Sequence, residues 1–209
     1  MISMTSEEHV VLVDASGHDL VDANGSVITM SKLSAHQQAR LHRAISVFIF
    51  SSKNELLLQK RARGKYHSAG LWSNTCCSHP RPGERPPEAA RRRLWEEMRI
   101  ECDLQELLMF TYQADFHNGL SEYEYDHVFI GFCDESPDPD PAEVADWKWL
   151  STKKLTDELT TKPEHFTIWL KCCFPAILQE LNRLSSIGPD KFIPSYVSIQ
   201  PEQTKIHIV

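Results

Sequence analysis

The chain of 209 residues contains no long hydrophobic run. Its apolar stretch at residues 44–50 has the length of a strand, and nothing approaches the ~18 residues that span a bilayer. Residues 1–14 carry Glu7, Glu8 and His9 without a basic segment, so we expect neither a signal peptide nor insertion into a membrane. Internal repeats and low-complexity segments are also absent, and the length predicts one domain.

The cysteines lack the spacing of a disulfide framework. The six stand at positions 76, 77, 102, 133, 172 and 173. Two adjacent pairs in a chain of this length fit reduced thiols better than bridges, because disulfide frameworks belong mainly to short secreted chains. We therefore expect a cytoplasmic protein.

An excess of positive charge is lacking as well. The net charge of −7 argues against a general nucleic-acid binder. Residues 60–93 depart from this balance, since they hold nine basic residues and only two acids, Glu84 and Glu88. Such a concentration suits a compact polyanion bound in a pocket. Alone it would equally fit a solvated basic face, so the choice depends on the neighbouring motifs.

Apolar patterning predicts an α+β fold. We expect strands at residues 10–14, 43–50, 55–59, 107–116, 123–133 and 147–150, with a hairpin turn at 51–54. We expect helices at residues 86–98, 152–159 and 163–184, with Pro175 a candidate kink in the last. Strands on both sides of a central helix indicate an αβα sandwich. This domain would span residues 1–184, and residues 185–209 would form a tail of unknown role.

Two sets of side chains bear chemistry. Cys77 stands two residues before His79, which puts a proton carrier and a metal ligand on one short segment. Glu122 and Glu124 lie at i, i+2 on an expected strand and so point to one face, where a cation between them would relieve their repulsion. Three imidazoles with these two acids would suit six-coordinate Mn²⁺, Mg²⁺ or Zn²⁺.

Any single histidine is more often a surface or core residue than a ligand. We give that interpretation to His18, His67, His117, His127, His165 and His207. The remaining candidates, His36, His42 and His79, are selected only by the family resemblance described below.

Residues 78–100 overlay the Nudix signature G-x5-E-x7-R-E-U-x-E-E-x-G-U, in which U is apolar. The matching positions are Glu84, Arg92, Leu94, Glu96, Glu97 and Ile100. Ser78, Arg93 and Arg99 replace the first glycine, the glutamate after the arginine and the last glycine. The missing acid at Arg93 weakens the set that holds divalent ions for diphosphate hydrolysis.

These departures and further motifs resemble type I isopentenyl-diphosphate isomerase, a Nudix-fold family that has lost hydrolysis. The resemblance runs from about His9 to Leu184. It rests on Lys32-x3-His36, LHRA at 41–44, QKR at 59–61, Lys65, GLWSNTCCSHP at 70–80, Tyr112, EYE at 122–124 and Trp169. It implies a Nudix-like αβα sandwich with a mixed sheet and a central loop–helix–loop.

The resemblance also implies a reaction: the interconversion of isopentenyl and dimethylallyl diphosphates through a carbocation. Cys77 and Glu124 would be proton carriers on opposite faces of the substrate, with Tyr112 assisting Glu124. Trp169 would stabilise the cation with its ring face and exclude water.

The same resemblance implies the binding groups. The metal ligands would be His36, His42, His79, Glu122 and Glu124. The diphosphate clamp would be Lys32, Arg61 and Lys65, with Arg93 as a further candidate. A second ion, Mg²⁺ carried by the substrate, would bind Glu97 and the backbone carbonyl of Cys77. The partner is then a small-molecule diphosphate, and the chain is expected to act as a monomer.

Two other hypotheses remain at this point. A Nudix pyrophosphohydrolase acting on a nucleoside diphosphate derivative would need an intact glutamate cluster on the helix, which Arg93 interrupts. A binding module with structural zinc would favour a closed, cysteine-rich set of four ligands, whereas this set is rich in oxygen.

Overall fold

The computed structural model describes residues 8–65, 67–116, 118–187 and 195–196. The strands are β1 (His9–Val11), β2 (Thr29–Ser31), β3 (His42–Phe50), β4 (Glu55–Arg61), β5 (Trp72–Ser73), β6 (Cys76–Ser78), β7 (Gln105–Asp115), β8 (Ser121–Phe132), β9 (Val144–Ser151) and β10 (Ser195–Tyr196). The helices are α1 (Lys32–Gln37), α2 (Pro86–Met98), α3 (Thr152–Thr161), α4 (Ile168–Ile187) and the 3-10 turn η1 (Pro163–His165).

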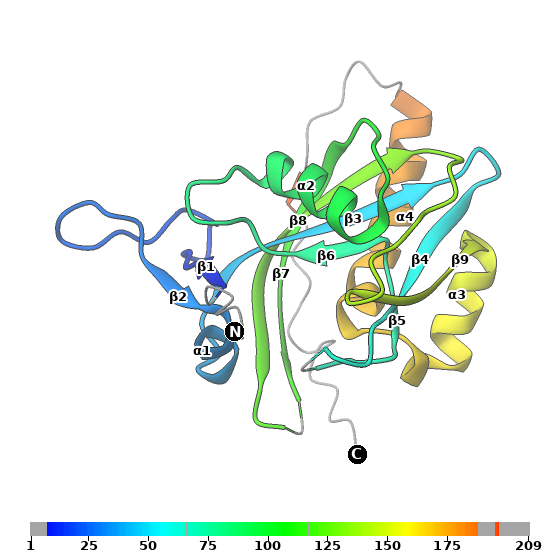
Figure 1. Cartoon of the computed structure of the whole chain (residues 1–209). Helices are drawn as coiled ribbons and strands as arrows, with labels where there is room; N and C mark the ends of the chain where they lie inside the picture. The colour runs from blue at the N-terminus through cyan, green and yellow to red at the C-terminus, as the bar shows by residue number, and fades with distance from the viewer. Residues whose placement is uncertain (1–7, 66, 117, 188–194, 197–209) are drawn as a thin grey trace.

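A mixed sheet of eight strands organises the molecule, and β1 with β2 forms a small second sheet (Figure 1). In the large sheet β3 is central: it runs parallel to β8 and antiparallel to β6. β7 and β8 form a long antiparallel hairpin. The turn expected at residues 51–54 does connect β3 to β4, but the pairing between these two strands is short. Only Phe50 and Leu56 pair, after which β4 leaves β3 to pair with β9 and β5.

Alternating apolar side chains on β3 bury both faces of the sheet. Phe48 and Phe50 belong to a core shared with α3 and α4. Ile45 and Ile49 belong to a second core under α2, where they pack with Leu94. Because period-2 alternation sends successive side chains to opposite faces, one strand contributes to both cores. The predicted αβα sandwich with a mixed sheet in a single domain is confirmed (Figure 1).

The helix expected at residues 163–184 is interrupted. It consists of η1 and α4, separated at Phe166 and Thr167. The break has a physical cause. Thr167 N–H donates to the carbonyl of Trp72 at 2.9 Å, and Phe166 forms a parallel β-bridge with Trp72, so this segment is extended against β5. Pro175 lies inside α4, as expected, and the helix continues to Ile187.

Five elements have no counterpart among the expected ones. They are β2, α1, β5, β6 and β10. Helix α1 begins after Ser31, whose hydroxyl accepts from Ser34 N–H as an N-cap. Of the expected tail at 185–209, the described part is the end of α4 and β10, which pairs in parallel with β7 at Leu108 and Met109. In the described part of the chain, every helix is too short or too polar to cross a membrane.

Candidate active site

Strand register brings the catalytic candidates together. β7 and β8 pair Tyr112 with Glu124, and the parallel pair β3 and β8 places His42 beside the same glutamate. Across β3, Cys77 of β6 pairs with Ser46. Paired residues on neighbouring strands share a face, and Ser46 lies on the same face of β3 as His42. The site is therefore built on four adjacent strands, on the side of the sheet covered by α4.

A compact cluster of metal-ligating atoms lies at the end of this row. The ligand atoms of His36, His42, His79 and Glu124 all lie within 4.8 Å of one another. His42 Nε2 is 3.2 Å from His79 Nε2, and these nitrogens lie 3.5 and 2.9 Å from Glu124 Oε1. Neighbouring ligands of an octahedral ion are about 3 Å apart, given metal–ligand distances of ~2.1 Å. This cluster can hold a divalent metal ion.

The imidazole tautomers support the same fit. His36 Nδ1 lies 2.6 Å from the carbonyl of Lys32, and His42 Nδ1 lies 2.7 Å from that of Arg40. A carbonyl only accepts, so Nδ1 carries a proton in both rings. Burial lowers the pKa of His36, so its neutral ring presents a lone pair at Nε2. Burial lowers the pKa of His79 to about 3, so this ring is neutral as well. The three imidazoles face a carboxylate, and this donor set suits a divalent cation.

Glu122 lies in an adjoining cluster. One of its oxygens forms a second group of possible ligand atoms with His36 and His67. His67 Nε2 lies 3.1 Å from Glu122 Oε1. Tyr112 connects the two carboxylates, because its hydroxyl hydrogen-bonds Glu122 and lies 2.7 Å from Glu124 Oε2. Burial and the charge of Glu124 raise the pKa of Glu122. Burial opposes ionisation of Glu124 too, but contacts from the imidazoles hold its pKa well below the usual value.

Polar groups surround the sulfur of Cys77. Its thiol donates to Asn74 Oδ1 at 2.8 Å, and the Trp169 indole N–H donates to the sulfur at 3.0 Å. The hydroxyl of Ser73 lies 3.6 Å away. Burial raises the pKa of Cys77 to about 12, so the sulfur carries its proton at neutral pH.

Four cations converge on the same cavity from separate elements. Lys32 is the first residue of α1, and its ammonium pairs with Glu8 at 3.0 Å. Arg61 ends β4, is 8% exposed and places its guanidinium 5.1 Å from the centre of the Trp169 ring. Its Nη2 donates to the carbonyl of His67 at 3.3 Å. Lys32 and Arg61 both line the cavity.

The other two cations share a carboxylate that the sequence did not single out. Lys65 pairs with Glu143, and Arg93 Nη2 lies 3.4 Å from the same side chain. Arg93 also pairs with Glu97 at 2.6 Å. The remaining oxygen of Glu97 accepts from Gln59 at 3.0 Å. Among the described residues, Glu97 is therefore satisfied by its neighbours and does not line the cavity.

The cavity itself is narrow, with a volume of about 50 Å³. The residues that line it are Lys32, Ile45, Ser46, Arg61, Lys65, His67, Cys77, Ser78, His79, Arg93, Tyr112, Glu122, Glu124 and Trp169. All the candidates for proton transfer and for the diphosphate clamp are in this set. His36 and His42 are not among the residues that line the cavity, and both are fully buried.

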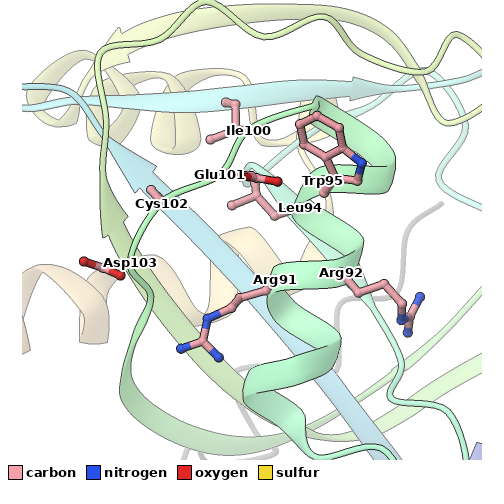
Figure 2. A pocket seen from close by; sticks show the side chains of 8 residues that line it. All are labelled: Arg91, Arg92, Leu94, Trp95, Ile100, Glu101, Cys102 and Asp103. Carbon is pink, nitrogen blue, oxygen red and sulfur yellow. The ribbon is translucent and has the colours of Figure 1, made fainter.

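A larger hollow of about 650 Å³ lies elsewhere, between α2 and residues 100–103 (Figure 2). Arg91 and Arg92 extend away from each other on either side of the helix, and Trp95 forms one end (Figure 2). The guanidinium of Arg92 is held by Glu84 at 2.6 and 2.7 Å. None of the expected catalytic, metal-binding or clamp residues lines this hollow, so the smaller cavity is the candidate active site.

The structure adds four residues that the sequence interpretation missed: Ser46, His67, Asp126 and Glu143. Asp126 is fully buried and accepts from Ser46 at 2.7 Å. It continues the i, i+2 series of Glu122 and Glu124, so strand periodicity offered a signal for it. His67 and Glu143 lie in loops, where the sequence carries no comparable period.

The fold and the motif around α2 define the class of protein. The NUDIX domain model matches residues 40–170, and the chain belongs to that family. Among solved structures, the MutT protein from Methanosarcina mazei Go1 aligns with a TM-score of 0.56 at 19% identity, over 68% of this chain and 95% of that chain. A protein of Deinococcus radiodurans aligns with a TM-score of 0.56 at 18% identity, over 74% of this chain and 90% of that chain. At these identities the likeness shows the fold alone.

Curated relatives identify one family within the NUDIX proteins. Isopentenyl-diphosphate Delta-isomerase 2 of Aromatoleum aromaticum is 48% identical over 172 residues, which cover 82% of this chain and 87% of that protein. Isopentenyl-diphosphate Delta-isomerase of Serratia proteamaculans is 50% identical over 164 residues, covering 78% of this chain and 89% of that protein. Within the NUDIX proteins, the chain belongs to the isopentenyl-diphosphate Delta-isomerase family, and the resemblance inferred from its motifs is confirmed.

Proposed function

We propose that this protein is a type I isopentenyl-diphosphate Delta-isomerase, which interconverts isopentenyl and dimethylallyl diphosphates for isoprenoid biosynthesis. The observation that carries the proposal is one cavity lined by Cys77, Glu124 and four cations, beside a cluster of metal-ligating atoms. Proton-carrying groups, a diphosphate clamp and a metal centre are the three elements that this reaction requires. Relatives that bear the isomerase name share nearly half of their residues with this chain.

The chemistry is a proton gained at C4 and a proton lost from C2. Protonation of the double bond at C4 leaves a tertiary cation at C3, and loss of a C2 proton restores the double bond in its new place. Cys77 and Glu124 are the two proton carriers, one giving while the other takes, and they exchange roles in the reverse reaction. Tyr112 donates to Glu124 Oε2 and so assists the transfer at that carboxylate.

The cation intermediate needs protection from water. Trp169 is 3% exposed and Tyr112 is 3% exposed, so both rings close the cavity with apolar surface. The indole can also stabilise a nearby carbocation through its ring face.

His36, His42, His79 and Glu124 would hold a divalent ion such as Mg²⁺, Mn²⁺ or Zn²⁺, and Glu122 of the adjoining cluster would be a further ligand. The ion supplies a fixed positive charge that keeps the buried carboxylates ionised and in place. The imidazoles contribute by the tautomers that their backbone contacts impose.

Lys32, Arg61, Lys65 and Arg93 would bind the diphosphate. Glu97 and the backbone carbonyl of Cys77 would hold a second Mg²⁺ that comes with the substrate. Glu97 would first have to release Arg93, because the two are paired at 2.6 Å. Movement of Arg93 from Glu97 to the diphosphate would allow both contacts. The expected cytoplasmic location, the monomeric state and the lack of nucleic-acid binding remain predictions.

The hydrolase hypothesis is not favoured by the arginines of α2. In the signature region, Glu84, Glu96 and Glu97 each accept from Arg92 or Arg93. Guanidinium groups thus occupy carboxylates that would otherwise be available to several metal ions.

The structural-zinc hypothesis lacks support from the ligand cluster. Among the described residues, the atoms grouped there are imidazole nitrogens and carboxylate oxygens beside a cavity. A closed structural zinc site would be expected to include cysteine thiolates, which this group does not contain.

The test is a proton NMR time course of isopentenyl diphosphate with the purified protein and Mg²⁺ in D₂O. We expect dimethylallyl diphosphate to appear, with deuterium entering the carbon positions that exchange. Release of inorganic phosphate would instead support the hydrolase. No reaction in a folded, metal-loaded sample would overturn the isomerase proposal.

A further inference from the structure

Glu143 is held at the clamp by backbone contacts from three elements. Its N–H donates to the carbonyl of Asp140, and its carbonyl accepts from Ala62 N–H just after β4, both at 3.0 Å. Asp140 N–H in turn donates to the carbonyl of Glu97 in α2 at 3.0 Å. The Glu143 carboxylate is therefore fixed between the end of β4, α2 and the start of β9.

This carboxylate contacts two cations that line the cavity. It pairs with the Lys65 ammonium and lies 3.4 Å from the Arg93 guanidinium. The side chains are only 24%, 24% and 16% exposed for Glu143, Lys65 and Arg93, so water screens their charges incompletely. Burial opposes ionisation of Glu143, but the hydrogen bond and charge of Lys65 keep its pKa below the usual value.

A diphosphate that binds Lys65 and Arg93 would share these cations with Glu143. The cavity holds about 50 Å³, whereas ligand pockets commonly measure ~300 Å³ or more. Enlarging it requires cavity-lining side chains to move, and Lys65 and Arg93 are among them. A diphosphate also offers these cations oxygen acceptors of the same kind as those of Glu143.

We propose that Glu143 is a positioning residue that holds Lys65 and Arg93 in place before substrate binds and competes with the substrate diphosphate for them. Its negative charge holds the two cations close to each other in spite of their mutual repulsion. It also weakens diphosphate binding, so that the product can leave. This inference rests on the proposed function, in which Lys65 and Arg93 contact the diphosphate.

The experiment compares the full-length protein with Glu143→Gln and Glu143→Asp. Glutamine keeps the shape and removes the charge, and aspartate keeps the charge. Glu180→Gln is the matched control, because it also removes a carboxylate paired with an arginine, Arg183, but outside the cavity lining. Inorganic diphosphate is titrated into each metal-loaded protein by calorimetry at low and at high salt, and KM and kcat for isopentenyl diphosphate are measured in parallel.

We expect Glu143→Gln to bind inorganic diphosphate about tenfold more tightly than the unmodified protein, with a steeper loss of affinity in salt. KM should fall, and kcat should stay equal or fall as product release slows. Glu143→Asp and Glu180→Gln should remain within about threefold of the unmodified protein.

One outcome would contradict the role proposed for Glu143, and another would contradict the proposed function. Equal or weaker binding by a folded Glu143→Gln, in a protein that still isomerises isopentenyl diphosphate, would overturn the competing role of Glu143 and leave the proposed function standing. An unmodified protein that neither binds inorganic diphosphate nor isomerises the substrate would overturn the proposed function itself.

Discussion

The indole Nε1 of Trp169 lies 3.0 Å from the sulfur of Cys77. The same N–H is 2.9 Å from the hydroxyl of Ser73, so the edge of the ring faces the thiol. One face of the ring meets the guanidinium of Arg61 at 5.1 Å. Trp169 therefore connects the proposed proton carrier to the proposed clamp, in addition to any role of its ring in stabilising a cation.

Replacement of Cys77 by alanine should abolish turnover. The thiol is the proposed proton carrier on one side of the substrate, and loss of such a group costs ~10²–10⁴ in rate. Metal content and folding should be close to normal, because the sulfur is absent from the ligand cluster. Rates of isomerisation, metal analysis and thermal unfolding check each part. Cys172→Ala in α4 is the matched control and should keep its activity; near-normal rates in Cys77→Ala would refute this proton-transfer scheme.

Replacement of Glu124 by glutamine should remove activity and weaken metal binding together. Its Oε1 lies near His42 and His79, and its Oε2 accepts from Tyr112, so one carboxylate serves the ion and the proton transfer. We expect at least ~10-fold lower metal affinity, measured by titration of the metal-free protein.

Tyr112→Phe separates the two roles of Glu124. It removes the hydroxyl that donates to Glu122 and Glu124 but keeps every ligand atom, so the rate should fall by ~10² while metal affinity falls less than in Glu124→Gln. A Tyr112→Phe protein that loses its metal would contradict this division.

The large elements of the fold could be predicted from the sequence because they carry a period. Helix α2 repeats Ala90, Leu94 and Met98, and β3 alternates between two cores. Helix α1 could not, since its six residues hold fewer than two turns and its start depends on the Ser31 cap. The break before α4 likewise arises from a tertiary contact with Trp72.

The active site could be predicted only in part. The motifs selected Tyr112, Glu124 and His42, but their proximity depends on strand register. A shift of two residues would keep every side chain on its face, so alternation alone cannot fix that register. The pairing of Glu97 with Arg93 was equally hidden, because the motif match treats the glutamate as a metal ligand and says nothing of its neighbours.

His67, which the sequence interpretation assigned to no role, should affect metal binding. Its Nε2 lies 3.1 Å from Glu122 Oε1, and its ring stacks on Phe116 at a centroid distance of 5.0 Å. His67→Phe keeps the stacking and removes the contact with the carboxylate. We expect a ~10-fold loss of metal affinity, whereas His67→Gln should retain most of it through its amide. Metal titration without substrate measures these affinities. If both variants bind the metal as tightly as the unmodified protein, the role of Glu122 does not depend on His67.

Glu84 should stabilise the fold in a pH-dependent way. Its carboxylate accepts from Arg92 at 2.6 and 2.7 Å and from Arg81 N–H at 2.8 Å, which joins the loop before α2 to the helix. The hydrogen bond from Arg92 is the main cause that lowers the pKa of Glu84 below 4.5. A carboxyl group with a lowered pKa in the folded state stabilises that state above its unfolded pKa. The stabilisation is lost as pH falls through the folded value.

Glu84→Gln should therefore lower the free energy of unfolding at neutral pH by about 1–2 kcal/mol, since the carboxylate is 15% exposed and its pairing is bidentate. The deficit should shrink as pH drops below 4.5, where the unmodified carboxyl also gains a proton. Urea unfolding at a series of pH values measures it. Glu88→Gln is the comparison, because Glu88 pairs with Arg85 at the exposed start of α2 and should change stability less. A deficit that stays constant down to the most acidic folded sample would mean that Glu84 acts through packing and not through its charge.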